Sequence, residues 1–445
     1  MFGTSGVRGP VGEVVTADLA LAIGRALAAD GADRIVVGRD ARTTGSFLAD
    51  ALSAGARECG VDVERLGVVP TPTVARSVGW RDADAGVVIT ASHNPPPDNG
   101  IKLWTPSGQA FDDDATDRIE ALIRDDVTPT AAWDAVGHER TWDRAIDHHR
   151  DAIVEAVDDD LADCSVIVDV GNGTGRLTAD VLADLGCSVE TINAQPDGRF
   201  PGRLSEPTAE HCGTLARTVE RTDADLGIAH DGDADRMMAV TDDGAFVTGD
   251  VLLALFARDA ASDGGRIAAP VNTSLAVDDA LDAVGASVTR TRVGDGYVAE
   301  RASEPDVVFG GEPSGAWIWP DETPCPDGPL AACRLAAMVA RAGPFSELVA
   351  GVETYPLRRE SVRTDRKVAV MERVTTLVAD RYDGEVDDRD GVRVGFDDGW
   401  LLIRPSGTEP LVRLTAEARD EGRADELVES ARTLVEEAQQ AVGSR

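Results

Sequence analysis

Three stretches of this chain repeat one pattern of local structure, and this repetition limits the possible folds more than any other feature. The stretches cover residues 34–69, 165–193 and 266–294. Each begins with a short apolar run, continues through a polar turn into an amphipathic segment, and closes with a second apolar run. The amphipathic segments end at Gly60, Gly186 and Gly285. Because glycine tolerates the left-handed conformation that ends many helices, the pattern predicts strand, helix and strand three times.

Strands that alternate with helices imply crossover connections and largely parallel sheets. A chain of 445 residues is also long enough for several domains of ordinary size. The sequence therefore predicts the α/β class, with three related α/β domains whose sheets are mixed and largely parallel.

The C-terminal part of the chain follows a different pattern. Residues 391–418 are typical of three strands joined by a turn and a loop, and residues 423–442 carry apolar side chains at helical spacing. We therefore expect a smaller α+β domain here. The polar stretch 358–367 is interpreted as the linker into it, with a hinge near 361–367. The expected domains are 1–145, 146–247, 248–355 and 356–445.

The charge of the chain is extreme, with 80 acidic against 43 basic residues and a net charge of −37. Such a chain repels nucleic acid and anionic lipid, so neither is an expected partner. The acidic residues are spread along the whole sequence, and lysine occurs only at positions 102 and 367. We interpret this as an adaptation to a very salty cytoplasm, because a screening length of ~3 Å at molar salt suppresses self-repulsion. Without a signal peptide or a run of about 18 apolar residues, a cytoplasmic location is expected.

A serine stands just beyond a predicted strand in the run ITASHNPPPDNGIKL, residues 89–103. Ser92 follows the apolar stretch 85–90, and α/β sheets commonly present active residues at such strand ends. Three prolines follow, which cannot continue a helix or a strand, so the loop should be stiff and exposed. Lys102 closes the run, although arginine carries nearly all the positive charge elsewhere. A compact ammonium beside a serine suggests phosphate handling or proton transfer.

Two other interpretations of this loop remain. One is an ordinary Asn-Pro turn. The other is a Ser-His-Asp hydrolase, which fits poorly because no G-x-S-x-G elbow surrounds the serine. In addition, we do not expect the side chain of His93 to face the hydroxyl of Ser92, its neighbour in sequence.

Three aspartates alternate in the run GIAHDGDADRMMAV, residues 227–240, between two predicted strands. This spacing lets Asp231, Asp233 and Asp235 converge on one cation, whereas without a cation they would repel one another. An EF-hand is excluded, because Arg236 stands where its loop needs glycine. Carboxylates that leave room for phosphate oxygens suit Mg²⁺. The alternatives are a solvated acidic turn and a D-x-D-x-T phosphatase, which would need threonine at the third position.

Two further loops carry groups that could bind a sugar phosphate. The run IRPSGTEP at 403–410 offers a guanidinium, two hydroxyls and a flexible amide, from Arg404, Ser406, Gly407 and Thr408. This predicts a phosphate cradle, with a plain hairpin turn as the alternative. In the run GGEPSG at 310–315, Glu312 and Ser314 could exchange hydrogen bonds with vicinal hydroxyls. The glycine-rich run 171–175 is interpreted as a strand-to-helix turn, because no G-x-G-x-x-G pattern fits it.

These four loops fall in chain order, one in each predicted domain. Together with FGTSGVRG at residues 2–9, they closely resemble the α-D-phosphohexomutase family, over essentially the whole chain. Members of that family have three related α/β domains and a smaller α+β fourth domain around a central cleft. The resemblance therefore implies the same architecture as the repeats, with the four loops facing that cleft.

The resemblance also implies a reaction on a hexose phosphate. Ser92 would carry a phosphoryl group, and Mg²⁺ would lie between that phosphate and Asp231, Asp233 and Asp235. Transfer of the phosphoryl to a hexose monophosphate would give a sugar bisphosphate, which serves as intermediate and primer. Return of its other phosphate to Ser92 would leave the isomeric monophosphate.

The resemblance assigns the remaining residues by their place in the motifs. Arg8 and Lys102 match the charged pair near the reacting oxygen, and His93 shapes the serine loop. Arg236 would lie beside the substrate. The sugar hydroxyls would contact Glu312 and Ser314. The non-reacting phosphate would contact Arg404, Ser406, Gly407 and Thr408.

The choice of sugar depends on a few positions. Residues 290–300, RTRVGDGYVAE, resemble the third-domain stretch of phosphoglucosamine mutases, whereas relatives acting on glucose or mannose phosphates often have histidine where Asp295 stands. The hydroxyl-binding loop of the family usually ends in histidine, where this chain has Ala316. We expect conversion of glucosamine 6-phosphate to glucosamine 1-phosphate by a monomer or homodimer. The alternatives are a phosphomannomutase or phosphoglucomutase, and a non-catalytic sugar-phosphate sensor.

Overall fold

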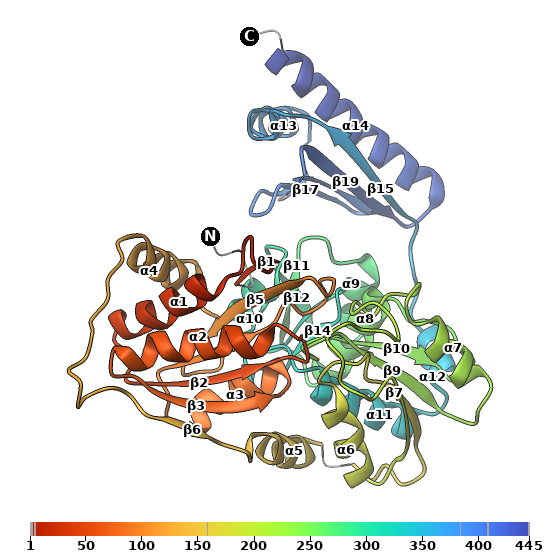
Figure 1. Cartoon of the computed structure of the whole chain (residues 1–445). Coiled ribbons are helices and arrows are strands. Elements are labelled where there is room, and N and C mark those ends of the chain that lie inside the picture. Colours follow the sequence, from red (N-terminus) through yellow and green to blue (C-terminus); the bar gives the residue numbers. More distant parts are fainter. Residues whose placement is uncertain (1–2, 4–5, 158, 383, 407–408, 444–445) are drawn as a thin grey trace.

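The described residues of the chain fold around four separate sheets (Figure 1). The computed structural model describes residues 3, 6–157, 159–382, 384–406 and 409–443. Three of the sheets combine parallel and antiparallel pairs, and the fourth is entirely antiparallel. The predicted fold class is therefore confirmed: three related α/β domains and a smaller α+β domain at the C-terminus.

The first sheet has six strands, in the order β1 (Val7–Pro10), β5 (Asp98–Trp104), β4 (Ala85–Ile89), β2 (Arg34–Arg39), β3 (Asp62–Val68) and β6 (Glu139–Thr141). Its helices are α1 (Ala17–Ala29), α2 (Gly45–Glu58), α3 (Thr71–Trp80) and α4 (Asp113–Arg124). Successive strand residues face opposite sides of the sheet. Accordingly, Ile35 and Val87 pack with α1 and α2, whereas Val36 and Val88 pack with α3.

The second and third sheets have four strands each. The second runs in the order β10 (Met237–Thr241), β9 (Leu226–His230), β7 (Ser165–Asp169) and β8 (Ser188–Ile192), with helices α5 (Ala145–Ala156), α6 (Arg176–Asp184) and α7 (Gly213–Glu220). The third runs in the order β12 (Ser287–Thr291), β11 (Arg266–Pro270), β13 (Val307–Glu312) and β14 (Ala316–Ile318). Its helices are α8 (Gly249–Ala260), α9 (Leu275–Asp282), α10 (Asp295–Ala302), α11 (Gly328–Ala342) and α12 (Phe345–Ala350). One continuous apolar core joins the two units, so they are packed as neighbours.

The three predicted strand–helix–strand repeats are confirmed. They are β2–α2–β3, β7–α6–β8 and β11–α9–β12, and in each repeat the two strands are parallel neighbours. The glycines that follow the three helices all have positive φ: 96° at Gly60, 101° at Gly186 and 72° at Gly285. A side chain would be strained at these positions, which explains why glycine ends each helix.

The fourth sheet is antiparallel, in the order β15 (Leu357–Arg363), β19 (Leu411–Ala418), β18 (Gly399–Pro405), β17 (Val392–Phe396) and β16 (Glu385–Asp387). Helices α13 (Lys367–Arg381) and α14 (Glu421–Gly443) cover one face of it. The opposite face presents Trp400 and Leu402 to Val271 of the third domain. In Figure 1 this domain stands above the other three and is joined to them by a single segment.

The interpretation of residues 358–367 as a linker is wrong. Most of this stretch forms β15, an edge strand paired with β19 along its whole length, and Lys367 begins α13. Alternate residues of the strand are exposed, and Glu360 forms an ion pair with Arg432 of α14. The polarity of the stretch therefore reflects a solvated edge strand rather than a lack of structure. The expected hinge at 361–367 thus overlaps the end of β15 and the start of α13, and the residues that connect the third and fourth domains are 351–356.

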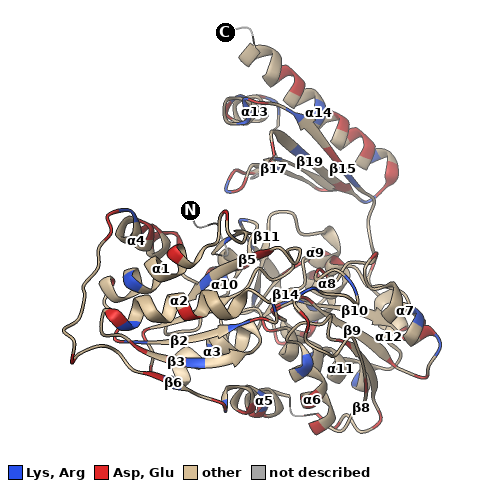
Figure 2. Cartoon of the chain, viewed as in Figure 1, with Lys and Arg blue, Asp and Glu red and all other residues tan. Residues whose placement is uncertain are grey.

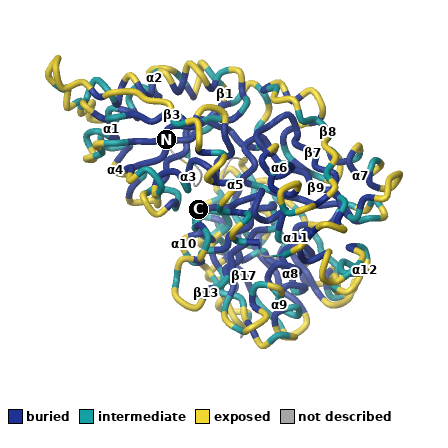
Figure 3. Tube along the Cα trace, turned by 90° about the horizontal axis from the view of Figure 1, so that it is seen from below, coloured by how far each residue is buried: buried dark blue, intermediate teal, exposed yellow. Residues whose placement is uncertain are grey.

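Burial and charge follow this arrangement. The buried segments gather along the strands, and the exposed ones lie mainly on outer helices and loops (Figure 3). Acidic residues occur in all four domains (Figure 2). Within the described part of the chain, no helix combines the length and the apolar character needed to cross a membrane.

Candidate active site

Ser92 lies just beyond the end of β4, and only 1% of its surface is exposed. Its φ of 50° is in the left-handed region, which is uncommon for a residue other than glycine and is concentrated at functional sites. Its N–H donates to Thr90 Oγ1 at 2.8 Å, and its carbonyl accepts from Ser205 Oγ at 2.8 Å. The expectation of an exposed loop holds for Pro95 and Pro97 but is wrong for Ser92, because the second domain covers it.

His93 faces the hydroxyl of Ser92, with 3.2 Å between Nδ1 and Oγ. The expectation that it would not is therefore wrong. Neighbouring side chains point apart in an extended strand, but the left-handed backbone of Ser92 turns them toward the same side. Burial lowers the pKa of His93 to about 2, and the positive charges of Arg236 and Arg8 act in the same direction. The imidazole beside the serine is thus neutral.

The turn between β9 and β10 brings the three predicted carboxylates together. Asp231, Asp233 and Asp235 are buried, and one oxygen from each lies within 4.8 Å of the others. Ala234, with a φ of 54°, bends the turn between them. Asp231 Oδ2 accepts the hydrogen bond of the Ser92 hydroxyl at 2.6 Å. The serine loop of the first domain therefore meets the carboxylate turn of the second.

Lys102 lies on β5 and supplies the positive charge next to these carboxylates. Its Nζ donates to Asp235 Oδ2 at 2.6 Å and to Asp233 Oδ2 at 3.2 Å. Burial opposes its charge, but the two carboxylates outweigh burial, and the net effect raises the pKa of Lys102. The side chain is therefore an ammonium, which suits stabilisation of negative charge better than removal of a proton.

The three carboxylates have the properties of a metal site. The Oδ1 atoms of Asp233 and Asp235 are buried and have no hydrogen-bond partner among the residues that the structure describes. A buried carboxylate oxygen without a partner is costly, and a hard cation with oxygen ligands removes that cost. Together with the oxygen of Ser92, these residues fit Mg²⁺, which takes carboxylates plus phosphate oxygens.

Arg8 lies beside the same group. It is on β1, where it pairs with Gly100, two residues before Lys102 on the neighbouring strand. Within the described part of the chain, its buried Nε has no hydrogen-bond partner. Burial is the largest cause that lowers the pKa of His93, and the positive charge of Arg8 acts in the same direction. Arg8 thus adds a second cation to the serine site.

The predicted hydroxyl-binding loop, residues 310–315, is joined directly to the carboxylate turn. Arg236, which follows the third aspartate, forms an antiparallel bridge with Ala316 at the start of β14. Next to it, the N–H of Met237 donates to the carbonyl of Gly315 at 2.9 Å. Ala316 is 3% exposed and contributes its backbone to this joint. The pairing explains how loops far apart in the sequence meet.

Glu312 ends β13, and its carboxylate is buried. Its Oε1 accepts from the N–H of Gly294 at 2.7 Å, and its Oε2 accepts from Ser314 Oγ at 3.2 Å. The pKa of Glu312 is raised to about 7, mainly by burial and, to a smaller extent, by the negative charge of Asp295. This loop therefore presents a carboxyl group that titrates near neutral pH.

The predicted phosphate-binding loop, residues 403–410, belongs to the fourth domain. Arg404 lies near the end of β18, and its Nε donates to Asp390 Oδ1 at 2.9 Å. Ser406 is buried, and its Oγ accepts from the N–H of Glu409 at 3.2 Å. The other two residues expected in this loop, Gly407 and Thr408, lie outside the described residues.

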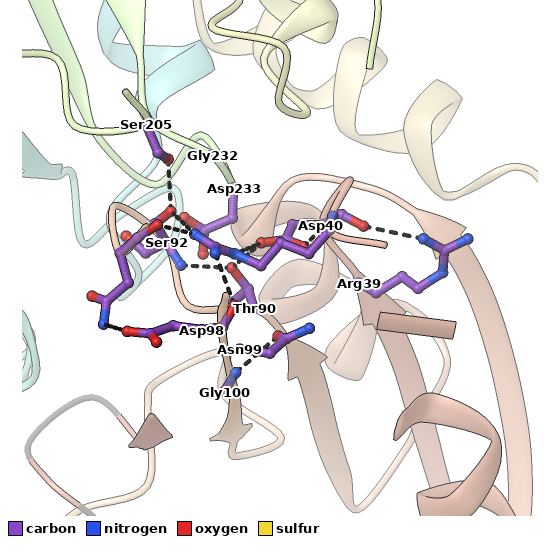
Figure 4. Close-up of polar contacts among 12 residues, drawn as sticks. Arg39, Asp40, Thr90, Ser92, Asp98, Asn99, Gly100, Ser205, Gly232 and Asp233 are labelled. Atoms are coloured by element: carbon purple, nitrogen blue, oxygen red, sulfur yellow. Dashed lines mark hydrogen bonds and ion pairs between the residues drawn. The ribbon is translucent and has the colours of Figure 1, made fainter. Parts of the chain in front are cut away.

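The sequence did not point to Arg42, whose side chain holds the serine loop in place through hydrogen bonds. Its buried guanidinium donates hydrogen bonds of 2.6 to 2.9 Å to the carbonyls of Ser92, Asn94, Pro95 and Asp98. Asp40 balances it at 3.0 Å and accepts from Thr90 Oγ1 at 2.7 Å (Figure 4). Their position was the one available signal, because both residues follow β2, a parallel neighbour of β4, and so lie at the same sheet edge as Ser92. Their contacts with the serine loop were not visible in the sequence.

The second domain contains an equivalent arrangement. Asp169 ends β7, and it accepts from Arg203 Nε at 2.7 Å. The same guanidinium donates to the carbonyl of His230, the residue before the carboxylate turn, at 2.5 Å. Both reacting loops are thus held by a buried Asp–Arg pair at the end of a parallel strand.

Lys367 is a further functional candidate that the sequence analysis did not single out. It is the first residue of α13, and its Nζ donates to the carbonyl of Ser406 in the phosphate-binding loop. Both lysines of the chain therefore contact a predicted functional loop. The scarcity of lysine that pointed to Lys102 applies equally to Lys367.

The four-domain fold with a serine loop against a carboxylate turn is that of a phosphohexomutase. Sequence models described as phosphoglucomutase/phosphomannomutase match every domain: α/β/α domain I at residues 1–129, domain II at 146–244, domain III at 248–355, and the C-terminal domain at 360–434. The chain belongs to the phosphoglucomutase/phosphomannomutase family and is an isomerase. The resemblance seen in its motifs is confirmed.

Full-length relatives and a solved structure agree with this assignment. A protein named "Probable phosphoglucosamine mutase" from Methanopyrus kandleri is 45% identical over 447 residues, covering 98% of each chain. One of the same name from Methanothermobacter thermautotrophicus is 46% identical over 444 residues, again covering 98% of each. The structure of a phosphoglucomutase/phosphomannomutase family protein from Burkholderia thailandensis superposes with a TM-score of 0.87 at 29% identity, covering 99% of this chain and 98% of that one.

Proposed function

We propose that the chain acts as a phosphoglucosamine mutase, which interconverts glucosamine 6-phosphate and glucosamine 1-phosphate through a phosphoserine and a sugar bisphosphate. The proposal is carried by the 2.6 Å hydrogen bond from the Ser92 hydroxyl to Asp231, within a buried group of three carboxylates. Phosphoryl transfer depends on positioning and charge neutralisation more than on covalent machinery. This arrangement supplies a positioned oxygen and a place for a cation.

The charged residues around Ser92 have different electrostatic roles. Asp231, Asp233 and Asp235 would hold Mg²⁺ beside the phosphate on Ser92, and the bound ion would neutralise part of the phosphate charge. Lys102 keeps its ammonium next to two of these carboxylates, at 2.6 and 3.2 Å. Its charge and that of Arg8 stabilise the transferring phosphoryl group.

In each phosphoryl transfer, one bond to phosphorus forms as another breaks, and one proton is exchanged. In the first, the C1 hydroxyl oxygen of the 6-phosphate forms a bond to the phosphorus while the bond from that phosphorus to Ser92 Oγ breaks. The sugar hydroxyl loses one proton, and Ser92 gains one. The ring of His93, 3.2 Å from Oγ, orients this oxygen, but with its pKa lowered to about 2 the ring does not take up the proton itself. The second transfer runs the same steps in reverse with the 6-phosphate of the turned bisphosphate.

The hydroxyl-binding loop supports an amino sugar. Glu312 is a buried carboxyl, and the charge of Asp295 acts on it strongly enough to help raise its pKa to about 7. Two negative groups near the sugar would attract the ammonium of glucosamine and would give no such advantage to glucose or mannose. The names of the two relatives point to the same substrate.

We also propose that the protein is adapted to high salt. Its net charge is −37, and acidic residues occur in all four domains (Figure 2). Salt weakens the repulsion among exposed charges. Stability against urea should therefore rise as KCl increases from dilute to molar concentration. The enzyme would act in the cytoplasm as a monomer or a homodimer, which light scattering in the same buffers distinguishes.

Turnover of three hexose 6-phosphates tests the proposed function. Glucosamine, glucose and mannose 6-phosphates are compared in KCl with Mg²⁺, each with a trace of its own bisphosphate. A clear preference in kcat/KM for glucosamine phosphate supports the proposal. A preference for glucose or mannose phosphate would contradict the proposed substrate but would leave the proposed mechanism unchanged. Phosphorylated Ser92 without turnover of any sugar would favour a sugar-phosphate sensor.

A further inference from the structure

Asp390 links the phosphate-binding loop to the third domain. It lies in the turn between β16 and β17, with 18% of its side chain exposed. Its Oδ1 accepts from Arg404 Nε at 2.9 Å, and its Oδ2 accepts from the N–H of Val293 at 3.0 Å. One carboxylate therefore contacts both a predicted phosphate ligand in the fourth domain and the backbone of the third.

The backbone on the other side of this contact leads directly to the sugar loop. The next residue after Val293 is Gly294, whose N–H donates to Glu312 Oε1 at 2.7 Å. Gly294 has a φ of 138°, a conformation that other residues rarely adopt. The N–H groups of the consecutive residues Val293 and Gly294 thus donate to Asp390 and to Glu312, respectively. Through them, Arg404 and Glu312 are connected by three hydrogen bonds and one short piece of backbone.

Other contacts keep these two domains together. Trp400 and Leu402 of β18 form an apolar cluster with Val271. Glu417 of β19 is 3% exposed, and it accepts from Ser274 Oγ at 2.6 Å and from the N–H of Leu275 at 2.7 Å. Docking of the fourth domain therefore does not depend on Asp390 alone, and a change at Asp390 can be studied in a folded, docked protein.

We propose that Asp390 is a positioning residue, which holds the Arg404 guanidinium at a set place relative to Glu312, so that the phosphate and the hydroxyls of the sugar are bound as one unit. The inference rests on the proposed function of these two loops. Arginine is long and flexible, and fixing it before the substrate arrives lowers the entropy lost on binding. In so acidic a protein, an unheld guanidinium would also have many other carboxylates to pair with.

This role predicts a separation between binding and chemistry. Ser92, the carboxylate turn and Lys102 lie in the first and second domains, and Asp390 contacts none of these residues directly in its described hydrogen bonds. Loss of Asp390 should therefore weaken the hold on the non-reacting phosphate and leave the transfer step at Ser92 nearly unchanged.

The Asp390→Asn variant is the sharpest single test. Asparagine can still accept from Val293 through its carbonyl oxygen, but its amide group cannot accept from Arg404, so docking is kept and the arginine is released. KM should rise about tenfold, the effect of one charge-assisted hydrogen bond, while kcat stays within about threefold. Asp388→Asn removes the same charge from an exposed position in the same turn, and its KM should not change.

A double-mutant cycle shows whether Asp390 acts through Arg404. Arg404→Met alone should raise KM at least as much as Asp390→Asn. Adding Asp390→Asn to Arg404→Met should then raise KM no further, because the group that Asp390 holds is already gone. A merely structural role would give additive losses and a lower unfolding midpoint instead.

The measurement does not depend on which sugar is correct. KM is determined with whichever of the glucosamine, glucose and mannose 6-phosphates the wild type turns over, and binding of inorganic phosphate is measured by calorimetry without turnover. A wild type that turns over none of the sugars contradicts the proposed function. An unchanged phosphate affinity in Asp390→Asn, or an unchanged KM, overturns the role of Asp390.

Discussion

The Ser92 hydroxyl donates a hydrogen bond of 2.6 Å to Asp231, although the two residues are 139 positions apart and belong to different domains. A second contact crosses the same boundary, from Ser205 Oγ to the carbonyl of Ser92 at 2.8 Å. A third joins the N–H of Thr71 to the carbonyl of Asp233 at 2.9 Å. Ser92 and the carboxylates are therefore positioned by one domain interface rather than by one loop.

Replacing Ser92 with alanine should abolish mutase turnover and leave the fold intact. The hydroxyl is the only part of the side chain that accepts the phosphoryl group in the proposed mechanism, so kcat should fall by roughly three orders of magnitude or more. Incubation with glucose 1,6-bisphosphate should leave the mass of the variant unchanged, whereas the wild type gains one phosphoryl group.

Ser107→Ala is the matched control, because Ser107 is an exposed serine of the same domain. It should keep full activity and take up the phosphoryl group. Near-normal turnover by Ser92→Ala would remove this serine from the mechanism.

Replacing Lys102 with methionine should destabilise the protein most when no divalent cation is present. Lys102 is 3% exposed, and it is the cation within hydrogen-bond distance of Asp233 and Asp235. Removing one partner of a buried ion pair leaves uncompensated charge, which costs ~3 kcal/mol. Urea unfolding with EDTA should show this loss, and added Mg²⁺ should restore part of it.

Lys367→Met removes the other lysine of the chain and serves as the control for this experiment. Its stability should not depend on Mg²⁺ more than that of the wild type. Equal destabilisation of Lys102→Met with and without Mg²⁺ would argue against a metal at the three aspartates.

The preference for glucosamine phosphate should depend on pH through Glu312. Burial and the charge of Asp295 raise the pKa of this carboxyl from 4.5 to about 7, while the backbone N–H of Gly294 and the charge of Arg236 oppose the shift. Glu312 is thus neutral below about pH 7 and negative above it. Because only the charged form attracts an ammonium, the ratio of kcat/KM for glucosamine over glucose 6-phosphate should rise as pH increases from 5.5 to 7.5.

Glucose 6-phosphate is the internal control, since its phosphate titrates in the same way. In Glu312→Gln the ratio should be low and flat across this range. The same shift affects stability in the opposite direction: a carboxyl with a raised pKa in the folded state makes the protein less stable as pH rises from 4.5 through 7. A wild-type ratio that does not vary with pH would contradict a role for the Glu312 charge.

The parts predicted correctly from the sequence are those with a local cause. The repeats were visible because helix stops such as Gly186 need a conformation that only glycine adopts easily. The carboxylate turn was visible because alternate aspartates repel unless they share a cation. By contrast, the polar edge strand β15 was interpreted as a linker, since its pairing with β19 comes from residues about 50 positions later.

The parts that could not be predicted depend on contacts made only in the fold. A buried arginine such as Arg42 looks like any surface arginine in the sequence, because its partners are backbone carbonyls of the serine loop. Arg203 in the second domain was overlooked for the same reason. The contact of His93 with Ser92 depends on one backbone angle, which no residue pattern specifies.

Lys367 should contribute to binding of the non-reacting phosphate. Its ammonium already contacts the carbonyl of Ser406, so its charge lies at the phosphate-binding loop, while the rest of α13 packs on the sheet. Lys367→Met should raise KM about fivefold, the effect of ~1 kcal/mol, with kcat nearly unchanged. Arg373→Met removes an exposed cation from the same helix and should leave KM at the wild-type value, which separates a local contact from a general change in charge. If both variants raise KM equally, the effect comes from the net charge of the fourth domain, and Lys367 has no specific role in the loop.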